Sequence, residues 1–168
     1  MKIYSTDRRM YPNFYDGEFG KRHLLICLYI RLGKSYRFED QRINEMTNTP
    51  EGRVSAALRQ AVINFGGEIR KVQWQGRVGA PDWLVMLFGC AVFVETKAPG
   101  ARPRKSQLVE FQRIERASGI PVLVIDRAED AIDIIDALLY RSEGNHEAYI
   151  RLCDGYSFER FLEAKPCG

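Results

Sequence analysis

Two apolar runs on either side of a glycine constrain the fold more than any other feature of the chain. The runs Trp-Leu-Val-Met-Leu-Phe and Cys-Ala-Val-Phe-Val flank Gly89. Runs of this length around a break predict two adjacent strands of a hairpin over residues 82–97. Asp82 begins the first strand and Glu95 ends the second, so antiparallel pairing is expected to bring the two carboxylates close together.

The end of this predicted hairpin collects charged side chains. Because side chains alternate between the faces of a strand, Glu95 and Lys97 share one face roughly 7 Å apart, with Thr96 on the opposite face. Two carboxylates and a lysine suit a divalent, oxygen-preferring cation and a phosphate. We therefore predict Asp82 and Glu95 as metal ligands and Lys97 as the group that orients an attacking water. The alternatives are a turn role for Asp82 and a Glu95–Lys97 salt bridge, for which a same-face i, i+2 pair is stretched.

A helix start precedes the hairpin. Thr49-Pro50-Glu51 combines an N-cap residue, a first-position proline and an acid in the first turn. Apolar residues follow at helical spacing: Val54, Ala57, Leu58, Ala61, Val62 and Phe65. Glu51 extends this line, so it is expected to face away from solvent. The alternative is an acid that only complements the helix dipole.

The rest of the chain predicts a layered fold. The expected elements are a strand at 68–75, a helix at 105–117, a strand at 120–125, a helix at 128–140 and a short helix near 157–164. This order predicts an α/β fold, a mixed central sheet flanked by helices. Trp74, Trp83 and Phe88 are interpreted as core residues, with base stacking as the alternative.

Charge is distributed unevenly along the 168 residues. The net charge is +3, yet residues 53–116 contain eleven Lys/Arg against five Asp/Glu, and residues 117–168 contain five against ten. The basic excess around the predicted site favours a polyanionic ligand. Four scattered cysteines predict neither a zinc site nor a disulfide framework. The longest apolar run, Leu24 to Ile30, is too short to span a bilayer, so a cytoplasmic protein with no membrane partner is expected.

The pattern Gly-Ala-Pro-Asp followed by Glu-Thr-Lys resembles the PD-(D/E)XK nuclease superfamily, and within it the short stand-alone type of the VRR-NUC (virus-type replication-repair nuclease) family. The resemblance covers about residues 49–126. It implies a restriction-endonuclease-like αβββαβ core at 49–142. A mainly helical N-terminal extension at 1–48 and a C-terminal extension at 143–168 would flank this core.

The resemblance also implies site residues. The family typically has a glutamate at the start of the helix before the hairpin and a glutamine on the helix after the lysine, which correspond here to Glu51 and Gln107. Gln107 lies on the inner side of its helix, where a hydrogen bond to a carbonyl is the alternative role. The backbone carbonyl of Thr96 often completes metal coordination in the family, while its side chain needs no catalytic role. The implied cofactor is Mg²⁺ or Mn²⁺, held by Asp82, Glu95 and Thr96, with Glu51 as a further ligand.

The function that this resemblance implies is metal-dependent endodeoxyribonuclease action, selective for branched DNA such as four-way (Holliday) junctions. A homodimer would supply the two sites that symmetric cleavage needs. Its interface is expected at a leucine stripe whose alternative is packing on its own core: Leu24, Leu25, Leu28 and Leu32. Expected DNA contacts, which could instead be merely solvated cations, are Arg77, Arg102, Arg104 and Lys105.

Two other functions remain open. Nicking, restriction-type or exonuclease action could use the same fold. Residues 21–76 also fit three helices and a two-strand wing, which would make a non-catalytic winged-helix DNA-binding module with a recognition helix from Pro50. That alternative leaves the arrangement of Asp82, Glu95 and Lys97 unexplained.

Overall fold

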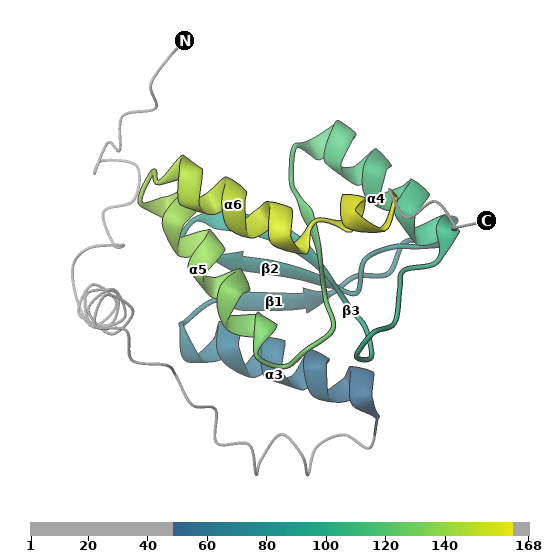
Figure 1. Ribbon diagram of the computed structural model, residues 1–168, viewed down its shortest axis with the longest axis horizontal. Helices are drawn as coiled ribbons and strands as arrows, with labels where there is room; N and C mark the ends of the chain where they lie inside the picture. The colour runs from purple at the N-terminus through teal and green to yellow at the C-terminus, as the bar shows by residue number, and fades with distance from the viewer. Residues whose placement is uncertain (1–48, 163–168) are drawn as a thin grey trace. The chain divides into compact units, whose positions relative to one another are not determined.

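The structure, a computed structural model, describes residues 49–162 (Figure 1). In chain order its elements are α3 (Pro50–Asn64), β1 (Glu68–Lys71), β2 (Trp83–Leu87), β3 (Cys90–Thr96), α4 (Lys105–Ser118), β4 (Val122–Ile125), α5 (Asp130–Ser142), α6 (His146–Tyr156) and the 3₁₀ helix η1 (Phe158–Phe161). From α3 to α5 the order is helix, three strands, helix, strand, helix. This order confirms the predicted α/β core. The expected N-terminal helices lie outside the described residues.

The four strands form one mixed sheet in the order β1-β2-β3-β4. The first three are antiparallel, and β4 runs parallel to β3. The β2–β3 hairpin pairs Trp83 with Val94 and Leu87 with Cys90. Phe88 and Gly89 form its two-residue turn, with φ angles of 54° and 74°, as the twist-compatible type I′ turn requires. The predicted hairpin is confirmed, with Asp82 immediately before its first strand.

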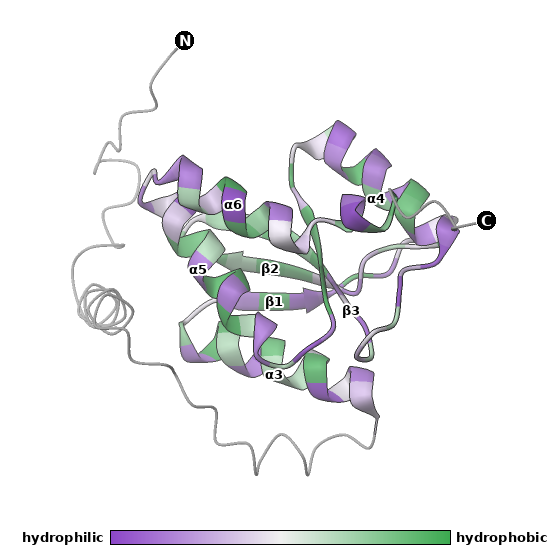
Figure 2. Cartoon of the chain, viewed as in Figure 1, coloured by the Kyte–Doolittle hydropathy of each residue, from purple (hydrophilic) through white to green (hydrophobic). Residues whose placement is uncertain are grey.

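Helices cover both faces of the sheet. All six residues of the predicted α3 stripe are buried, and α3 packs against α5 and β1. On the opposite face, Phe93 packs in a cluster with Phe111 of α4, Phe158 of η1 and two β4 valines. Figure 2 shows the apolar colour along β2 and the hydrophilic first turn of α4. Successive β3 residues therefore point toward different helices. The last two residues of the strand, Glu95 and Thr96, accordingly face opposite sides of the sheet.

The structure corrects several local predictions. β1 ends at Lys71, not at residue 75, and Trp74 is 42% exposed, so its assignment to the core was wrong. Trp83 is half-buried, whereas Phe88 is buried as expected. The helix near 157–164 is only the short η1.

The chain also contains a helix, α6, that the sequence reasoning missed. Asn145 caps it by accepting a hydrogen bond from the backbone N–H of Ala148 (3.2 Å). None of its residues is fully buried, but its half-buried Tyr149, Leu152, Cys153 and Tyr156 fall at i, i+3, i+4 and i+7, a helical spacing that could have identified it. It packs against α5 and β4, and this tertiary contact stabilises a helix of only eleven residues. The proposed boundary at residue 142 stays a prediction.

The structure also bears on the winged-helix alternative and on membrane-spanning helices. β1 pairs with β2 as the edge of the central sheet, so residues 68–71 do not form the separate wing that the winged-helix alternative needs. Within residues 49–162, no helix is long and apolar enough to cross a membrane.

A partly buried acid on α5 gives a prediction about stability. Asp136 Oδ1 has no hydrogen-bond partner within the described part of the chain, and burial, with Asp133 nearby, raises its pKa from 3.8 to about 6. Because the folded form holds this proton more tightly, stability is lost as the pH rises from about 4 through 6. Asp136→Asn is expected to raise the free energy of unfolding by about 1–2 kcal/mol at pH 8 and to change it little near pH 4. Urea unfolding at both pH values measures the difference, and a gain independent of pH would contradict the prediction.

Candidate active site

Asp82 and Glu95 meet where the β2–β3 hairpin opens. The backbone N–H of Asp82 donates to Glu95 Oε2 (3.2 Å), and the backbone N–H of Thr96 donates to Asp82 Oδ2 (3.0 Å). Glu95 thus accepts a hydrogen bond from the backbone of Asp82, and Asp82 accepts one from the backbone of Thr96, the residue that follows Glu95. The two acids lie close together because the antiparallel register places residue 82 opposite residue 95.

Glu95 is completely buried and is surrounded by donors. Its Oε1 accepts hydrogen bonds from Lys97 Nζ and from Gln107 Nε2. The Glu95–Lys97 ion pair therefore forms, although the i, i+2 spacing was predicted to be too stretched for it. Burial, followed by the negative charge of Asp82, raises the pKa of Glu95 from 4.5 to about 7, against the opposing effect of Lys97 and Gln107.

Gln107 connects the start of α4 to this carboxylate. Its side-chain oxygen accepts the backbone N–H of Arg104 (2.9 Å), while its amide nitrogen donates to Glu95. The same side chain therefore caps the helix and fixes Glu95. The structure thus brings Gln107, which the resemblance alone had implied, next to the two acids.

A second hydrogen-bonded chain reaches Asp82 from α3. Thr96 Oγ1 donates to Asp82 Oδ2 (2.9 Å) and lies 2.7 Å from Ser55 Oγ. Since the single Thr96 hydroxyl proton goes to Asp82, Ser55 is the donor in the Ser55–Thr96 bond. The Thr96 side chain, expected to need no role, positions Asp82. Ser55 was missed, although it follows Glu51 by four residues on the same helix face.

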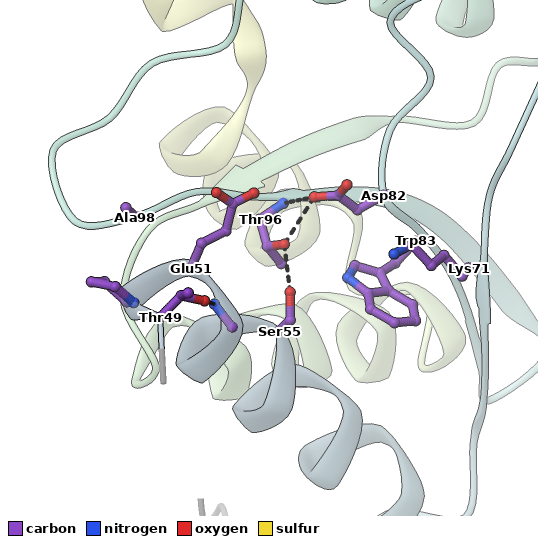
Figure 3. Close-up of a pocket in the computed structure, with 10 residues that line it drawn as sticks. Thr49, Glu51, Ser55, Lys71, Asp82, Trp83, Thr96 and Ala98 are labelled. Carbon is purple, nitrogen blue, oxygen red and sulfur yellow. Dashed lines mark hydrogen bonds between the residues drawn. The ribbon is translucent and has the colours of Figure 1, made fainter. Parts of the chain in front are cut away.

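A cavity of about 330 Å³ opens beside Asp82 (Figure 3). Its lining comes from the start of α3, from β1–β2 and from the end of β3: Thr49, Pro50, Glu51, Gly52, Ser55, Lys71, Asp82, Trp83, Thr96 and Ala98. Glu51 is exposed at its mouth, so the prediction that it faces away from solvent was wrong. Figure 3 shows its carboxylate directed toward the space near Thr96 and Asp82. Lys71 lines the cavity although the sequence reasoning gave it no role, and Trp83, interpreted from the sequence as a core residue, lines it as well.

The oxygen-rich donor set suits a hard divalent cation. Glu95 is held beside Asp82 at some cost, since burial, followed by the negative charge of Asp82, raises the pKa of Glu95, and a cation between the two acids would offset that cost. Within residues 49–162 no three His, Cys, Asp or Glu side chains cluster closely enough to hold a metal ion. Glu51 therefore does not complete a three-carboxylate cluster here. The Thr96 carbonyl stays the predicted third ligand.

The predicted DNA-binding cations lie around the start of α4. Arg102, Arg104 and Lys105 are exposed. Arg77 is more constrained, because its Nη1 lies 3.5 Å from Oε1 of the buried Glu110 on α4. The first three are therefore free to contact a ligand, whereas Arg77 already has a carboxylate partner.

An αβββαβ core that ends its hairpin in Asp…Glu-x-Lys defines the PD-(D/E)XK class of nucleases, and the comparisons specify the family. A solved structure described as a VRR_NUC domain is 36% identical, with 96% of that chain and 52% of this one covered and a TM-score of 0.48. "Putative nuclease p44" of Acyrthosiphon pisum secondary endosymbiont phage 1 is 39% identical over 89 residues, which are 94% of that protein and 52% of this chain. No model of a known protein family matches the chain.

These sequence identities extend over almost the whole of each relative. The chain therefore belongs to the VRR-NUC family of nucleases. Both matches cover about half of the chain, so the remainder has no counterpart in these two relatives.

Proposed function

We propose that the chain is a metal-dependent endodeoxyribonuclease that cleaves branched DNA, with four-way junctions as the preferred substrate. The observation that supports this most directly is the hydrogen-bonded pair of Asp82 and Glu95, with Lys97 bonded to the same Glu95 carboxylate. Nuclease membership fixes the bond that is broken, whereas metal dependence and the choice of DNA structure are our proposals.

Asp82, Glu95 and the Thr96 carbonyl would hold Mg²⁺ or Mn²⁺, and Glu51 would approach from across the cavity. Such a cation supplies Lewis-acid stabilisation of the charge on the phosphate. In the reaction, a water oxygen forms a bond to phosphorus while the bond to the leaving sugar oxygen breaks. The Lys97 ammonium, only slightly exposed beside Glu95, would orient that water and stabilise the added negative charge.

The protein's own hydrogen bonds would keep the ligands in position. Ser55 and Thr96 orient Asp82 from the α3 side, and Gln107 orients Glu95 from the α4 side. Each acid is thus fixed by a different helix packed on a different face of the sheet. This arrangement preorganises the site, since neither carboxylate must find its orientation when substrate binds.

Substrate choice and assembly are tested together. Resolution of a four-way junction takes two cuts in opposed strands, so a two-fold dimer with both sites facing one DNA channel is expected. The proposed interface, Leu24 to Leu32, lies outside the described residues. Light scattering measures the assembly, and cleavage of four-way, flap and linear DNA at equal concentration measures the preference. A monomer that cuts linear duplex as fast as junctions would leave a nuclease of nicking or restriction type and contradict the resolvase.

The exposed cations beside α4 predict a salt effect. Replacing Arg102, Arg104 and Lys105 by Ala should lower the slope of log affinity against log salt by about 2–3, because each phosphate contact releases about 0.9 of a counterion from duplex DNA. Fluorescence anisotropy over a salt series, in chelator, measures the slope. Arg151→Ala on α6, where the arginine pairs with Glu147, is the control and should leave it unchanged. An unchanged slope in the triple variant would show that these cations are only solvated.

A further inference from the structure

The segment between β1 and β2 exposes two apolar side chains beside the candidate site. Residues 73–78 are all exposed, and within them Trp74 is 42% and Val78 is 78% exposed. Two large apolar side chains thus stay exposed within five residues of one loop although a core is available, and exposed apolar surface can mark a binding site. The core is available here, because Val72, directly before this stretch, packs against the α4-side cluster.

The loop is anchored at three points. At its base the backbone N–H of Val72 donates to the carbonyl of Asp82 (2.8 Å). Gly79, with φ +99°, lies so close to α4 that an added Cβ would be 2.7 Å from the Ser106 carbonyl oxygen. Arg77 contacts the buried Glu110 of the same helix. The two exposed apolar side chains, Trp74 and Val78, therefore lie on a loop whose backbone is held in place by these contacts.

These anchors place the loop next to the reacting groups. Trp74 follows Val72 by two residues, so the Cα atoms of the two residues lie within roughly 7 Å of each other. The backbone of Val72 is in turn hydrogen-bonded to the backbone of Asp82. Figure 1 shows the segment between β1 and β2 extending to the first turn of α4. That turn contains Gln107, which bonds to Glu95, and the exposed Lys105. A chain of phosphates passing Asp82 would thus pass both the cations and the loop that contains Trp74.

We propose that Trp74 stacks on an unpaired base next to the phosphate that is cleaved, with Val78 as a second apolar contact. This inference rests on the proposed function, since it assigns a DNA contact to the same site. The exposed cations around the loop, Lys71 and Lys105, favour a polyanion over an apolar protein surface. Aromatic side chains bind single bases through stacking, because every base presents an aromatic face. At a branch point such a base is available without the cost of opening a paired duplex.

Binding without cleavage tests the proposal independently of catalysis. In EDTA, affinity is measured by fluorescence anisotropy for a fully paired duplex and for the same duplex with one unpaired thymine. Trp74→Ala should weaken binding to the second DNA by about tenfold to a hundredfold and change binding to the first by no more than about twofold. Trp74→Phe should retain most of the affinity because a ring remains. Ile150→Ala on α6, which also removes an exposed apolar side chain, should change neither.

Fluorescence provides a readout of stacking itself. The chain has two tryptophans, Trp74 and Trp83, so in a Trp83→Phe variant excited selectively at tryptophan the emission comes from Trp74. DNA with the unpaired thymine should quench this emission, and the paired duplex should not. Equal loss of affinity for both DNAs in Trp74→Ala, no loss at all, or strong protection of Trp74 from acrylamide in the free protein would each overturn the proposal. A protein that binds as expected but cuts nothing in Mg²⁺ would instead refute the proposed function and leave the stacking contact standing.

Discussion

Glu95→Gln and Asp82→Asn are each expected to lower DNA cleavage by about a hundredfold or more. Each substitution removes a charge at nearly constant volume. In Asp82→Asn the side-chain oxygen of the introduced asparagine can still accept from the Thr96 backbone and hydroxyl that now bond to Asp82, so the hairpin end should keep its geometry. Cleavage rates at saturating Mg²⁺ measure the effect. Thermal unfolding and DNA affinity, both expected to change little, separate it from misfolding or loss of binding.

Asp136→Asn is the matched control for Asp82→Asn. It also neutralises a partly buried aspartate, but on α5 and outside the cavity lining. Its cleavage rate should equal that of the unsubstituted protein. Retention of more than a small part of the activity by Glu95→Gln or Asp82→Asn, in a folded protein, would show that the predicted metal ligands are wrong.

Withdrawal of divalent metal is expected to stop cleavage completely while DNA binding persists. Mg²⁺ or Mn²⁺ should restore the activity, whereas Ca²⁺ should restore little, because calcium prefers more ligands and longer bonds than a site with two carboxylates and one carbonyl provides. Cleavage in EDTA and after addition of each metal is the direct measurement. The expected loss is the largest in this set, because without the cation its Lewis-acid stabilisation of the charge on the phosphate is lost.

Metal binding can be measured apart from activity. Titration with Mn²⁺, followed by its electron paramagnetic resonance signal, should show binding to the unsubstituted protein and much weaker binding to Asp82→Asn. Gln107→Ala should weaken binding less, since Gln107 positions Glu95 and is not itself a predicted ligand. Full cleavage in EDTA would remove the metal-dependent mechanism. Equal DNA binding in chelator with no cleavage under any condition would favour a non-catalytic binding protein.

Much of the core could be predicted because its signals are local. The start of α3 follows from Thr49, whose hydroxyl does accept the Gly52 N–H (3.1 Å), and the hairpin turn follows from Gly89. Because side chains alternate between the two faces of β3, the sequence alone assigns Glu95 and Thr96 to opposite faces. By contrast, β1 ends at Lys71 and the chain leaves the sheet before Gln73 and Trp74. The residue types at these two positions do not indicate that the strand has ended.

The site was less predictable than the fold where it depends on contacts between distant segments. The Ser55–Thr96 bond joins residues 41 positions apart, and the Gln107–Glu95 bond crosses from helix to strand. Glu51 continues an apolar stripe in sequence, yet in the folded chain it lies in the first turn of α3 and stays exposed at the mouth of the cavity. Helix periodicity gives the direction of a side chain but not whether another element extends far enough to bury it.

By itself, then, the sequence determined the order of elements, the pairing of β2 with β3 and the proximity of Asp82 to Glu95, because turn geometry and strand register act over a few residues. Only the tertiary structure decided that α3 holds Asp82 through Ser55 and Thr96, that α4 holds Glu95 through Gln107, and that Trp74 stays exposed. The physical reason is that these features depend on how far each helix extends along the sheet and where the chain leaves it. Those distances are set by the packing of the whole core.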